Sequence, residues 1–197
     1  MSRMKLYYAP AACSLADHIA LHEIGDPFDI ERVNIRTHKT DSGIDFRTVS
    51  AKGYVPALIL ADGQMLTESI AVLDYLATLH PHLAPSGPLG RSRLLEALAF
   101  ISTELHRAFK PMWHGGTEAE RARAGETVTD LLDLMCDGMN GPFLFGDQLT
   151  VADFYLFVML EWAKRFDVAV PQAMAQLREQ MRERPAVIAA LRTEGLL

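Results

Sequence analysis

The segment at residues 5–15, KLYYAPAACSL, constrains the fold of this chain more than any other stretch. A β-prone run passes through a turn at Pro10, and Cys13 follows where a helix is expected to begin. The free N–H groups and the positive end of the helix dipole lower the pKa of a thiol there from about 8.5. The segment thus predicts a strand, a turn and a helix headed by a thiolate. A small buried core thiol is the competing interpretation.

A second informative run is GYVPALIL at residues 53–60, where Pro56 stands at the head of a short apolar strand. A proline at that place removes no hydrogen bond from the middle of a sheet. Asp62 and Gly63 favour a tight hairpin turn, and apolar residues at helical spacing follow over residues 70–77. The predicted order is therefore strand, Cys-headed helix, strand, Val-Pro, hairpin and helix.

The second half of the chain is predicted to be helical. Residues 80–90 contain three prolines and two glycines, which are typical of a linker. Beyond them, apolar residues recur every three or four positions over residues 94–109, 131–139 and 154–162. Thr150 and Asp153 form a capping-box pattern before the last of these runs. We expect one domain over residues 1–80, a linker over 81–89 and an all-helical domain over 90–197.

Composition excludes several classes of function. The formal net charge is −6, and no dense basic run that would suit a phosphate backbone is present. No apolar stretch approaches the roughly 20 residues of a membrane span, and the N-terminus lacks a signal-peptide profile. The expectation is a cytoplasmic protein that binds neither nucleic acid nor membranes. His18 and His22 are the only histidines four apart in helical context, and no further ligand set accompanies them, so no metal site is predicted.

The thiol chemistry is limited by what surrounds Cys13. No second cysteine follows within a Cys-x-x-Cys pattern, so a two-cysteine thioredoxin mechanism is disfavoured. A lone thiolate forms a mixed disulfide with an external thiol, or its thiol donates a hydrogen bond to a bound thiolate. Cys136 is predicted to be a buried structural thiol.

These motifs resemble a known family. The first eighty residues are similar to the thioredoxin-like domain of glutathione transferases, and the matching positions are those of the bacterial, cysteine-containing Beta class: Tyr8, Cys13, Ser14, Lys52, Gly53, Val55, Pro56, Glu68 and Ser69. The capping box at Thr150 resembles the one in the family's helical domain. The resemblance implies an α/β thioredoxin-like N-terminal domain plus an all-α C-terminal domain. It also implies glutathione as co-substrate, a homodimer and a role in detoxification.

The resemblance implies a glutathione site in the first domain. The extended backbone of Val55, before a cis Pro56, would pair with the cysteinyl portion, beside Tyr54. Ser69 would meet the γ-glutamyl carboxylate and Glu68 its ammonium, although a plain helix cap also explains Ser69.

Two further glutathione contacts depend on positions where the match leaves alternatives. The family's lysine for the glycyl carboxylate aligns with His38, so either His38 or Lys39 takes this role, and a solvated loop is an equal alternative. Glu104 matches a residue that reaches across the dimer to the ammonium, and an ordinary exposed helix glutamate is its alternative.

Catalytic roles follow from the same match. Cys13 and His106 would be catalytic, and Ser14 and Tyr8 are the hydroxyls available to the sulfur. Each of three residues also has a structural alternative. Ser14 is then a plain helix cap, Tyr8 a packed aromatic residue and His106 a structural histidine. The wall for an apolar electrophile would come from four residues of the helical domain: Arg107, Phe109, Lys110 and Trp113. For Phe109, packing in the core is the alternative.

The sequence thus predicts a glutathione transferase that conjugates glutathione to apolar electrophiles, with thiol–disulfide exchange through Cys13 as a related reaction of the same site. The alternative is a non-catalytic glutathione- or partner-binding protein on the same fold, because a fold does not fix a function.

Overall fold

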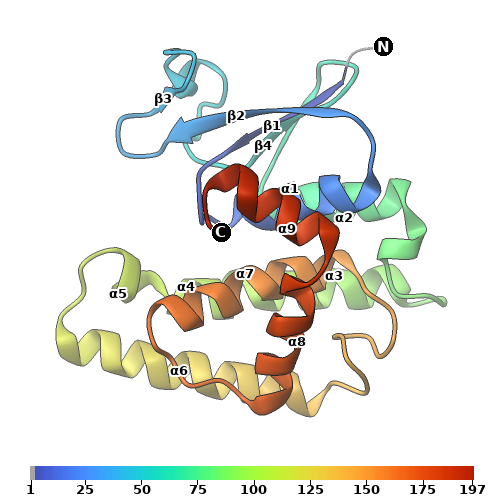
Figure 1. Ribbon diagram of the computed structural model, residues 1–197, viewed down its shortest axis with the longest axis vertical. Helices are drawn as coiled ribbons and strands as arrows, with labels where there is room; N and C mark the ends of the chain where they lie inside the picture. The colour runs from blue at the N-terminus through green and yellow to red at the C-terminus, as the bar shows by residue number, and fades with distance from the viewer. Residues whose placement is uncertain (1–2) are drawn as a thin grey trace. The chain divides into compact units, whose positions relative to one another are not determined.

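The computed structural model describes residues 3–197 and divides the chain into two compact units (Figure 1). Unit 1 comprises Met1–Leu79 together with Arg184–Leu197, and unit 2 comprises His80–Glu183. The sequence predicts that the C-terminal segment belongs to the helical domain over residues 90–197. It joins unit 1 instead, because its helix packs against the first helix of the chain.

Unit 1 is a mixed sheet with helices. Its elements in chain order are β1 (Met4–Tyr8), α1 (Ser14–Ile24), β2 (Phe28–Asn34), β3 (Lys39–Thr40), a 3-10 turn (Phe46–Thr48), β4 (Ala57–Ile59), β5 (Met65–Thr67), α2 (Ser69–Leu79) and α9 (Pro185–Glu194). The strand order is β3-β2-β1-β4-β5, with β1 and β2 parallel and the other neighbours antiparallel. The thioredoxin-like α/β arrangement expected for this half is confirmed.

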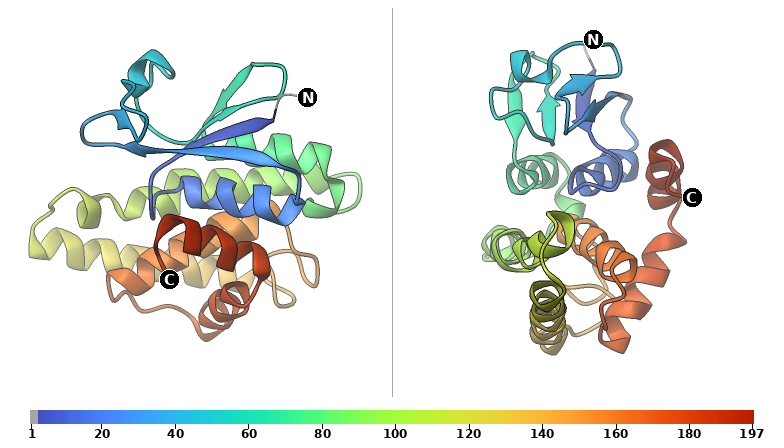
Figure 2. Two further views of the ribbon diagram at one scale, coloured as in Figure 1. Left: turned by 45° about the horizontal axis from the view of Figure 1, so that its top comes forward. Right: turned by 90° about the vertical axis from the view of Figure 1, so that its left-hand side faces the viewer.

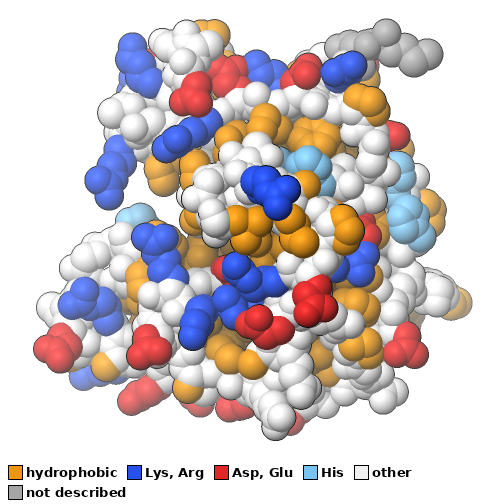
Figure 3. All heavy atoms as spheres, in the orientation of Figure 1, with side chains coloured by type: hydrophobic (Ala, Val, Ile, Leu, Met, Phe, Trp, Pro, Cys, Tyr) orange, Lys and Arg blue, Asp and Glu red, His pale blue; other side chains and the backbone are white. Residues whose placement is uncertain are grey.

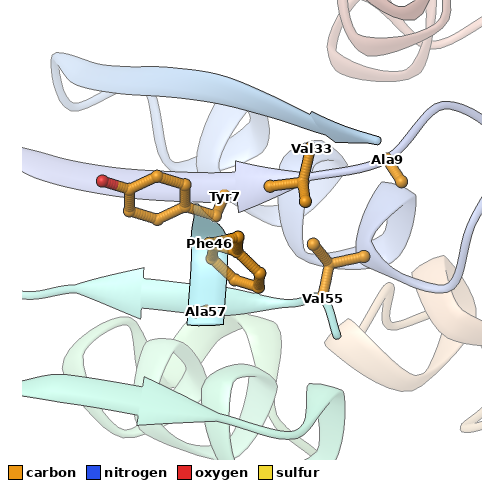
Figure 4. Packing of buried hydrophobic residues seen from close by; sticks show 6 residues of the cluster. All are labelled: Tyr7, Ala9, Val33, Phe46, Val55 and Ala57. Carbon is orange, nitrogen blue, oxygen red and sulfur yellow. The ribbon is translucent and has the colours of Figure 1, made fainter. Parts of the chain in front are cut away.

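The two faces of the sheet are covered differently. Figure 2 shows α1 and α2 along one face, with α9 beside α1. Side chains alternate between the faces of a strand, and Tyr8 contacts His18 of α1, so this residue points to the helices. On the opposite face Tyr7 packs against Phe46 of the 3-10 turn, with ring centroids 5.3 Å apart, inside the cluster shown in Figure 4.

Unit 2 is helical. Its elements are a 3-10 turn (Pro81–Leu83), α3 (Gly90–Phe100), a π-helical turn (Ile101–Leu105), α4 (His106–Ala108), α5 (Lys110–Trp113), α6 (Glu118–Asp137), α7 (Val151–Arg165) and α8 (Gln172–Arg182). Helix α7 is buried on nearly all sides, as expected of a central helix that is apolar around its whole circumference. The single helix predicted for residues 94–109 is divided by the π-helical turn, which a periodicity of apolar residues does not reveal.

The capping box predicted at the start of α7 is confirmed. The Asp153 carboxylate accepts hydrogen bonds from the Thr150 backbone N–H and hydroxyl, each at 2.8 Å, and from the Leu144 N–H at 2.8 Å. Asp153 is fully buried, and these three donors offset the cost of placing a carboxylate in the core.

The surface carries charges of both signs. Figure 3 shows acidic side chains beside basic ones on the face that it draws. Ion pairs within unit 2 include Arg182 with Glu161, at 2.7 Å. Within residues 3–197, no helix is long and apolar enough to cross a membrane.

Candidate active site

Cys13 lies at the N-cap of α1, as the sequence predicts. The chain turns sharply before it, with Ala11 in the left-handed region at φ 57°. The Ala16 N–H donates to the Cys13 carbonyl and opens the helix. The Cys13 sulfur is 3.9 Å from the carbonyl oxygen of Val55. The thiol therefore lies at the meeting point of the first helix start and the Val-Pro segment.

The charge of the Cys13 thiol differs from the expectation. Burial, followed by the nearby Asp17 carboxyl group, raises the pKa of Cys13 to about 12. A helix dipole contributes about 0.3–1 kcal/mol, which is less than one pKa unit. Desolvation therefore outweighs the dipole, and the prediction of a depressed pKa is wrong.

The two residues considered as hydroxyl partners of the thiol have other contacts: the Ser14 hydroxyl contacts the Ala9 backbone, and the Tyr8 ring packs against α1. The buried Ser14 hydroxyl lies 3.2 Å from the backbone N–H and 3.4 Å from the carbonyl oxygen of Ala9, so it ties the helix start to the end of β1. Tyr8 is buried, and its ring packs against His18 with centroids 5.4 Å apart. These contacts agree with the structural alternative for both residues.

The Val55–Pro56 peptide bond is cis, as the resemblance implied. Val55 is buried, whereas Tyr54 beside it is 46% exposed. The Tyr54 hydroxyl donates to the Glu68 carboxylate at 2.9 Å, and Lys52 forms an ion pair with the same carboxylate. This segment is therefore connected to the start of α2 through Glu68.

Glu68 and Ser69 lie at the junction of β5 and α2. Glu68 has a φ of 73°, a left-handed conformation that is uncommon for a residue with a side chain and concentrates at functional sites. The Lys52 ammonium holds the pKa of the exposed Glu68 carboxyl below its usual value. Ser69 opens α2 and is buried, and its hydroxyl oxygen forms a hydrogen bond with an Asp17 carboxyl oxygen at 3.0 Å.

The loop proposed for the glycyl carboxylate presents two different side chains. His38 has a φ of 55°, and its Nδ1 atom is 2.9 Å from the Gly53 carbonyl oxygen. Gly53 itself has a φ of 70°, and an added Cβ would lie 3.4 Å from the His38 ring. Lys39 is exposed. The His38 ring is thus partly engaged within unit 1, while Lys39 extends into solvent.

A buried group that sequence reasoning missed ties α9 to the turn before Cys13. The Glu194 carboxylate accepts a hydrogen bond from the Ala11 N–H at 3.0 Å, and its other oxygen is 2.9 Å from His18 Nδ1. The side chains of His18 and Glu194 are fully buried. An acid and a histidine 176 positions apart carry no local signal that they pair.

Asp17 is the second missed residue. It follows Cys13 by one helical turn and is fully buried against Ser69. Asp17 and His18 interrupt the apolar residues 15–21 of α1, and this was the available signal, because a polar group on a buried face needs a partner.

In unit 2, His106 follows directly on the π-helical turn, a feature often found at functional sites. Its Nδ1 atom is 2.8 Å from the Tyr155 hydroxyl, and its ring packs edge-on against Trp162 with centroids 4.9 Å apart. Burial lowers the pKa of His106, so the ring is neutral at pH 7.

The four residues assigned to the electrophile wall differ in exposure. Phe109 is fully buried and packs edge-on against Trp162, which agrees with the core alternative. Arg107 and Lys110 are exposed, and Trp113 is partly exposed, with Arg165 stacked over its ring at 4.9 Å. Three of the four are thus open to solvent.

Two other predicted residues lie on unit 2. Glu104 is exposed within the π-helical turn and accepts a hydrogen bond from the Thr103 hydroxyl at 2.9 Å. Cys136 is partly buried near the end of α6 and is a free thiol. No group of three or more candidate metal-ligating side chains occurs in the part of the chain that the structure describes.

A thioredoxin-like unit with a cysteine at the first helix start and a cis Val-Pro segment, together with a helical unit, defines the class of thiol-dependent transferases that use glutathione. Family models described as "Glutathione S-transferase, N-terminal domain" and "Glutathione S-transferase, C-terminal domain" match residues 12–79 and 84–192. The chain belongs to the glutathione S-transferase family.

Individual relatives are similar to this chain over nearly its full length. Glutathione S-transferase GstA of Escherichia coli O157:H7 is 37% identical over 203 residues, covering 98% of this chain and 100% of the relative. A sphingomonad glutathione S-transferase solved in complex with glutathione is 40% identical with a TM-score of 0.88, covering 98% and 100% of the two chains. A beta class enzyme of Sphingomonas chungbukensis has the same identity, TM-score and coverage. The chain thus resembles the bacterial Beta class.

Proposed function

We propose that this glutathione transferase conjugates glutathione to apolar electrophiles. The glutathione sulfur attacks an electrophilic carbon and a C–S bond forms. The leaving group departs with the bonding electron pair, and the thiol proton of glutathione passes to solvent. The observation that carries this proposal is the placement of the Cys13 sulfur 3.9 Å from the Val55 carbonyl oxygen, at the segment where the cysteinyl part of glutathione would pair.

The remaining parts of glutathione have candidate partners in unit 1. The N-terminus of α2 at Ser69 suits the γ-glutamyl carboxylate, because free N–H groups and the helix dipole favour an anion there. Glu68 suits the ammonium. For the glycyl carboxylate we favour Lys39, because it is exposed whereas the His38 ring is already close to the Gly53 carbonyl.

Cys13 acts in conjugation as a hydrogen-bond donor. Its raised pKa keeps the thiol protonated at neutral pH, and an S–H group can donate to the glutathione thiolate and stabilise it. This role requires no Cys13 thiolate.

Thiol–disulfide exchange is a second reaction of the same site. The deprotonated Cys13 sulfur attacks a glutathione mixed disulfide, a Cys13–glutathione disulfide forms, and the other thiolate leaves with the electron pair. A second glutathione thiolate then attacks this disulfide, which releases the Cys13 thiolate and glutathione disulfide. The raised pKa makes this reaction slow at neutral pH and faster as the pH rises.

For the electrophile we propose the side of unit 2 formed by His106 and Trp113, with Arg107 and Lys110 at its margin. The neutral His106 ring suits a hydrogen bond to a polar group of the acceptor, and the Trp113 ring supplies an apolar surface.

The test compares two assays on the wild type, Cys13→Ala and the control Cys136→Ala. The assays are conjugation of a chlorodinitrobenzene and glutathione-dependent reduction of hydroxyethyl disulfide. In Cys13→Ala we expect disulfide reduction to disappear. We expect the kcat/KM of conjugation to fall about 10- to 100-fold, the loss of one charge-assisted hydrogen bond worth about 1.4–2.7 kcal/mol. Cys136→Ala should match the wild type.

Two outcomes contradict the proposal. Disulfide reduction that survives in Cys13→Ala excludes the exchange mechanism. A wild type that binds glutathione but is inactive in both assays favours the non-catalytic binding protein instead.

A further inference from the structure

Asp17 occupies an unusual position for a carboxyl group. It lies in the first turn of α1, is fully buried, and has one oxygen 3.0 Å from the Ser69 hydroxyl at the start of α2. Its other oxygen, Oδ1, has no hydrogen-bond partner among residues 3–197. An ionised carboxylate with an unpaired buried oxygen is costly, whereas a protonated carboxyl tolerates this site.

The surrounding elements supply no cation to Asp17. Helices α1 and α2 contain no lysine or arginine. On β1, Lys5 is paired with Glu31, and on α9 Arg192 is exposed. The Lys52 ammonium is paired with Glu68.

The remaining titratable groups around this site also leave Asp17 uncompensated. His18 on α1 is bound to Glu194 of α9, Tyr8 of β1 packs against the His18 ring, and the Cys13 thiol is neutral because burial raises its pKa. Burial accordingly raises the pKa of Asp17 to about 8, so the group is mainly protonated at pH 7.

The protonation state of Asp17 decides how the Ser69 hydroxyl is used. A serine hydroxyl has one proton to donate, and an ionised carboxylate can only accept. When Asp17 is ionised, the Ser69 hydroxyl donates its hydrogen bond to Asp17, so only the lone pairs of the Ser69 oxygen face a bound anion. When Asp17 is protonated, it can donate to the Ser69 oxygen, and the Ser69 proton becomes available to another acceptor.

We infer that Asp17 is a positioning residue for glutathione: its buried carboxyl group sets the Ser69 hydroxyl to donate to the γ-glutamyl carboxylate. The inference rests on the proposed function, which places that carboxylate at Ser69. Ionised Asp17 both removes this donor and adds a second negative charge beside the ligand. Glutathione binding is therefore linked to protonation of Asp17.

The test uses S-methylglutathione, which lacks a titrating thiol, and calorimetry from pH 6 to 9. We expect the wild-type Kd to rise about tenfold between pH 7 and pH 9, because binding requires the protonated form of a group that titrates near pH 8. In Asp17→Asn the side-chain amide donates to Ser69 at every pH, so the ratio of the Kd at pH 9 to the Kd at pH 7 should be much smaller than in the wild type. Titration of the ligand's own ammonium is common to both proteins and cancels in their ratio.

A second measurement needs no variant. Calorimetry of the wild type at pH 8, in buffers of different ionisation enthalpy, should show uptake of about half a proton per S-methylglutathione bound.

The outcomes separate the inference from the proposed function. No proton uptake at pH 8, or equal pH profiles for the wild type and Asp17→Asn, overturns the role of Asp17. Undiminished affinity of Ser69→Ala at pH 7 instead overturns the proposed placement of the γ-glutamyl carboxylate, and with it the basis of the inference.

Discussion

Two effects act on the Cys13 thiol in opposite directions. The start of α1 favours the thiolate by less than one pKa unit, whereas burial raises the pKa to about 12. We therefore expect Cys13 to react with iodoacetamide more slowly than a free thiol at pH 7.5, with a rate that still rises with pH above 9. The measurement is alkylation rate against pH, with the modified peptide identified by mass. A rate plateau below pH 8.5 at Cys13 would contradict this expectation.

Sequence separation explains which residues of the site the sequence could not assign. Cys13 and Ser69 stand at helix starts, which local patterns reveal. Asp17 and His18 lie in the same apolar helix, yet their partners Ser69 and Glu194 are 52 and 176 positions away. A charged residue can be recognised as out of place from the sequence, but the group that compensates it depends on tertiary packing.

At the level of elements, the strands and helices of unit 1 follow from local rules. The proline at the strand head predicted β4, and the Asp-Gly turn predicted the hairpin. The apolar periodicity predicted α2. The cis state of Val55–Pro56 came from the family resemblance, because local sequence does not determine it. The π-helical turn at Ile101–Leu105 escaped prediction, since one extra residue in a turn leaves the apolar spacing nearly unchanged.

The two capping boxes of unit 2 offer a matched test of how burial changes the value of a cap. Asp153 caps α7 in the core with three hydrogen bonds, whereas Glu120 accepts from the N–H and hydroxyl of Thr117 at the exposed start of α6. We expect Asp153→Ala to lower the free energy of unfolding by about 2–4 kcal/mol and Glu120→Ala to lower it by much less, because water replaces the contacts of the exposed Glu120 side chain. Urea denaturation at pH 7 measures both values, and equal losses would contradict the role of burial.

At the scale of the whole molecule, the two units do not correspond to the two halves of the sequence, because the C-terminal segment belongs to unit 1. After unit 2 the chain returns to unit 1, where Arg184 pairs with Glu23 and α9 places Glu194 under the turn before Cys13. A boundary drawn from linker composition alone assigned this segment to the helical domain, because the sequence of α9 is as helical as its neighbours. Its membership in unit 1 depends on the packing of α9 against α1, which includes the buried contacts of Glu194.

The family resemblance implies a homodimer, and the state of Glu68 gives a physical reason for a shared site. Glu68 is exposed and already bound by Lys52 and Tyr54, so it is a weak partner for the γ-glutamyl ammonium, and a second carboxylate would strengthen the site. We propose that the Glu104 carboxylate of the second copy supplies it. Sedimentation should then show a dimer at micromolar concentration. Glu104→Gln should raise the KM for glutathione about three- to tenfold with the dimer intact, as expected for one exposed charge contact of about 0.6–1.4 kcal/mol.

The matched control is Glu96→Gln, which removes an exposed carboxylate of the preceding helix α3 that is paired with Arg93. It should leave the KM for glutathione unchanged. High salt should reduce the difference between the wild type and Glu104→Gln, because an exposed charge contact is screened. A fully active monomer, or a Glu104→Gln dimer with the wild-type KM for glutathione, would exclude the shared site, since neither result is compatible with a carboxylate contributed by the partner.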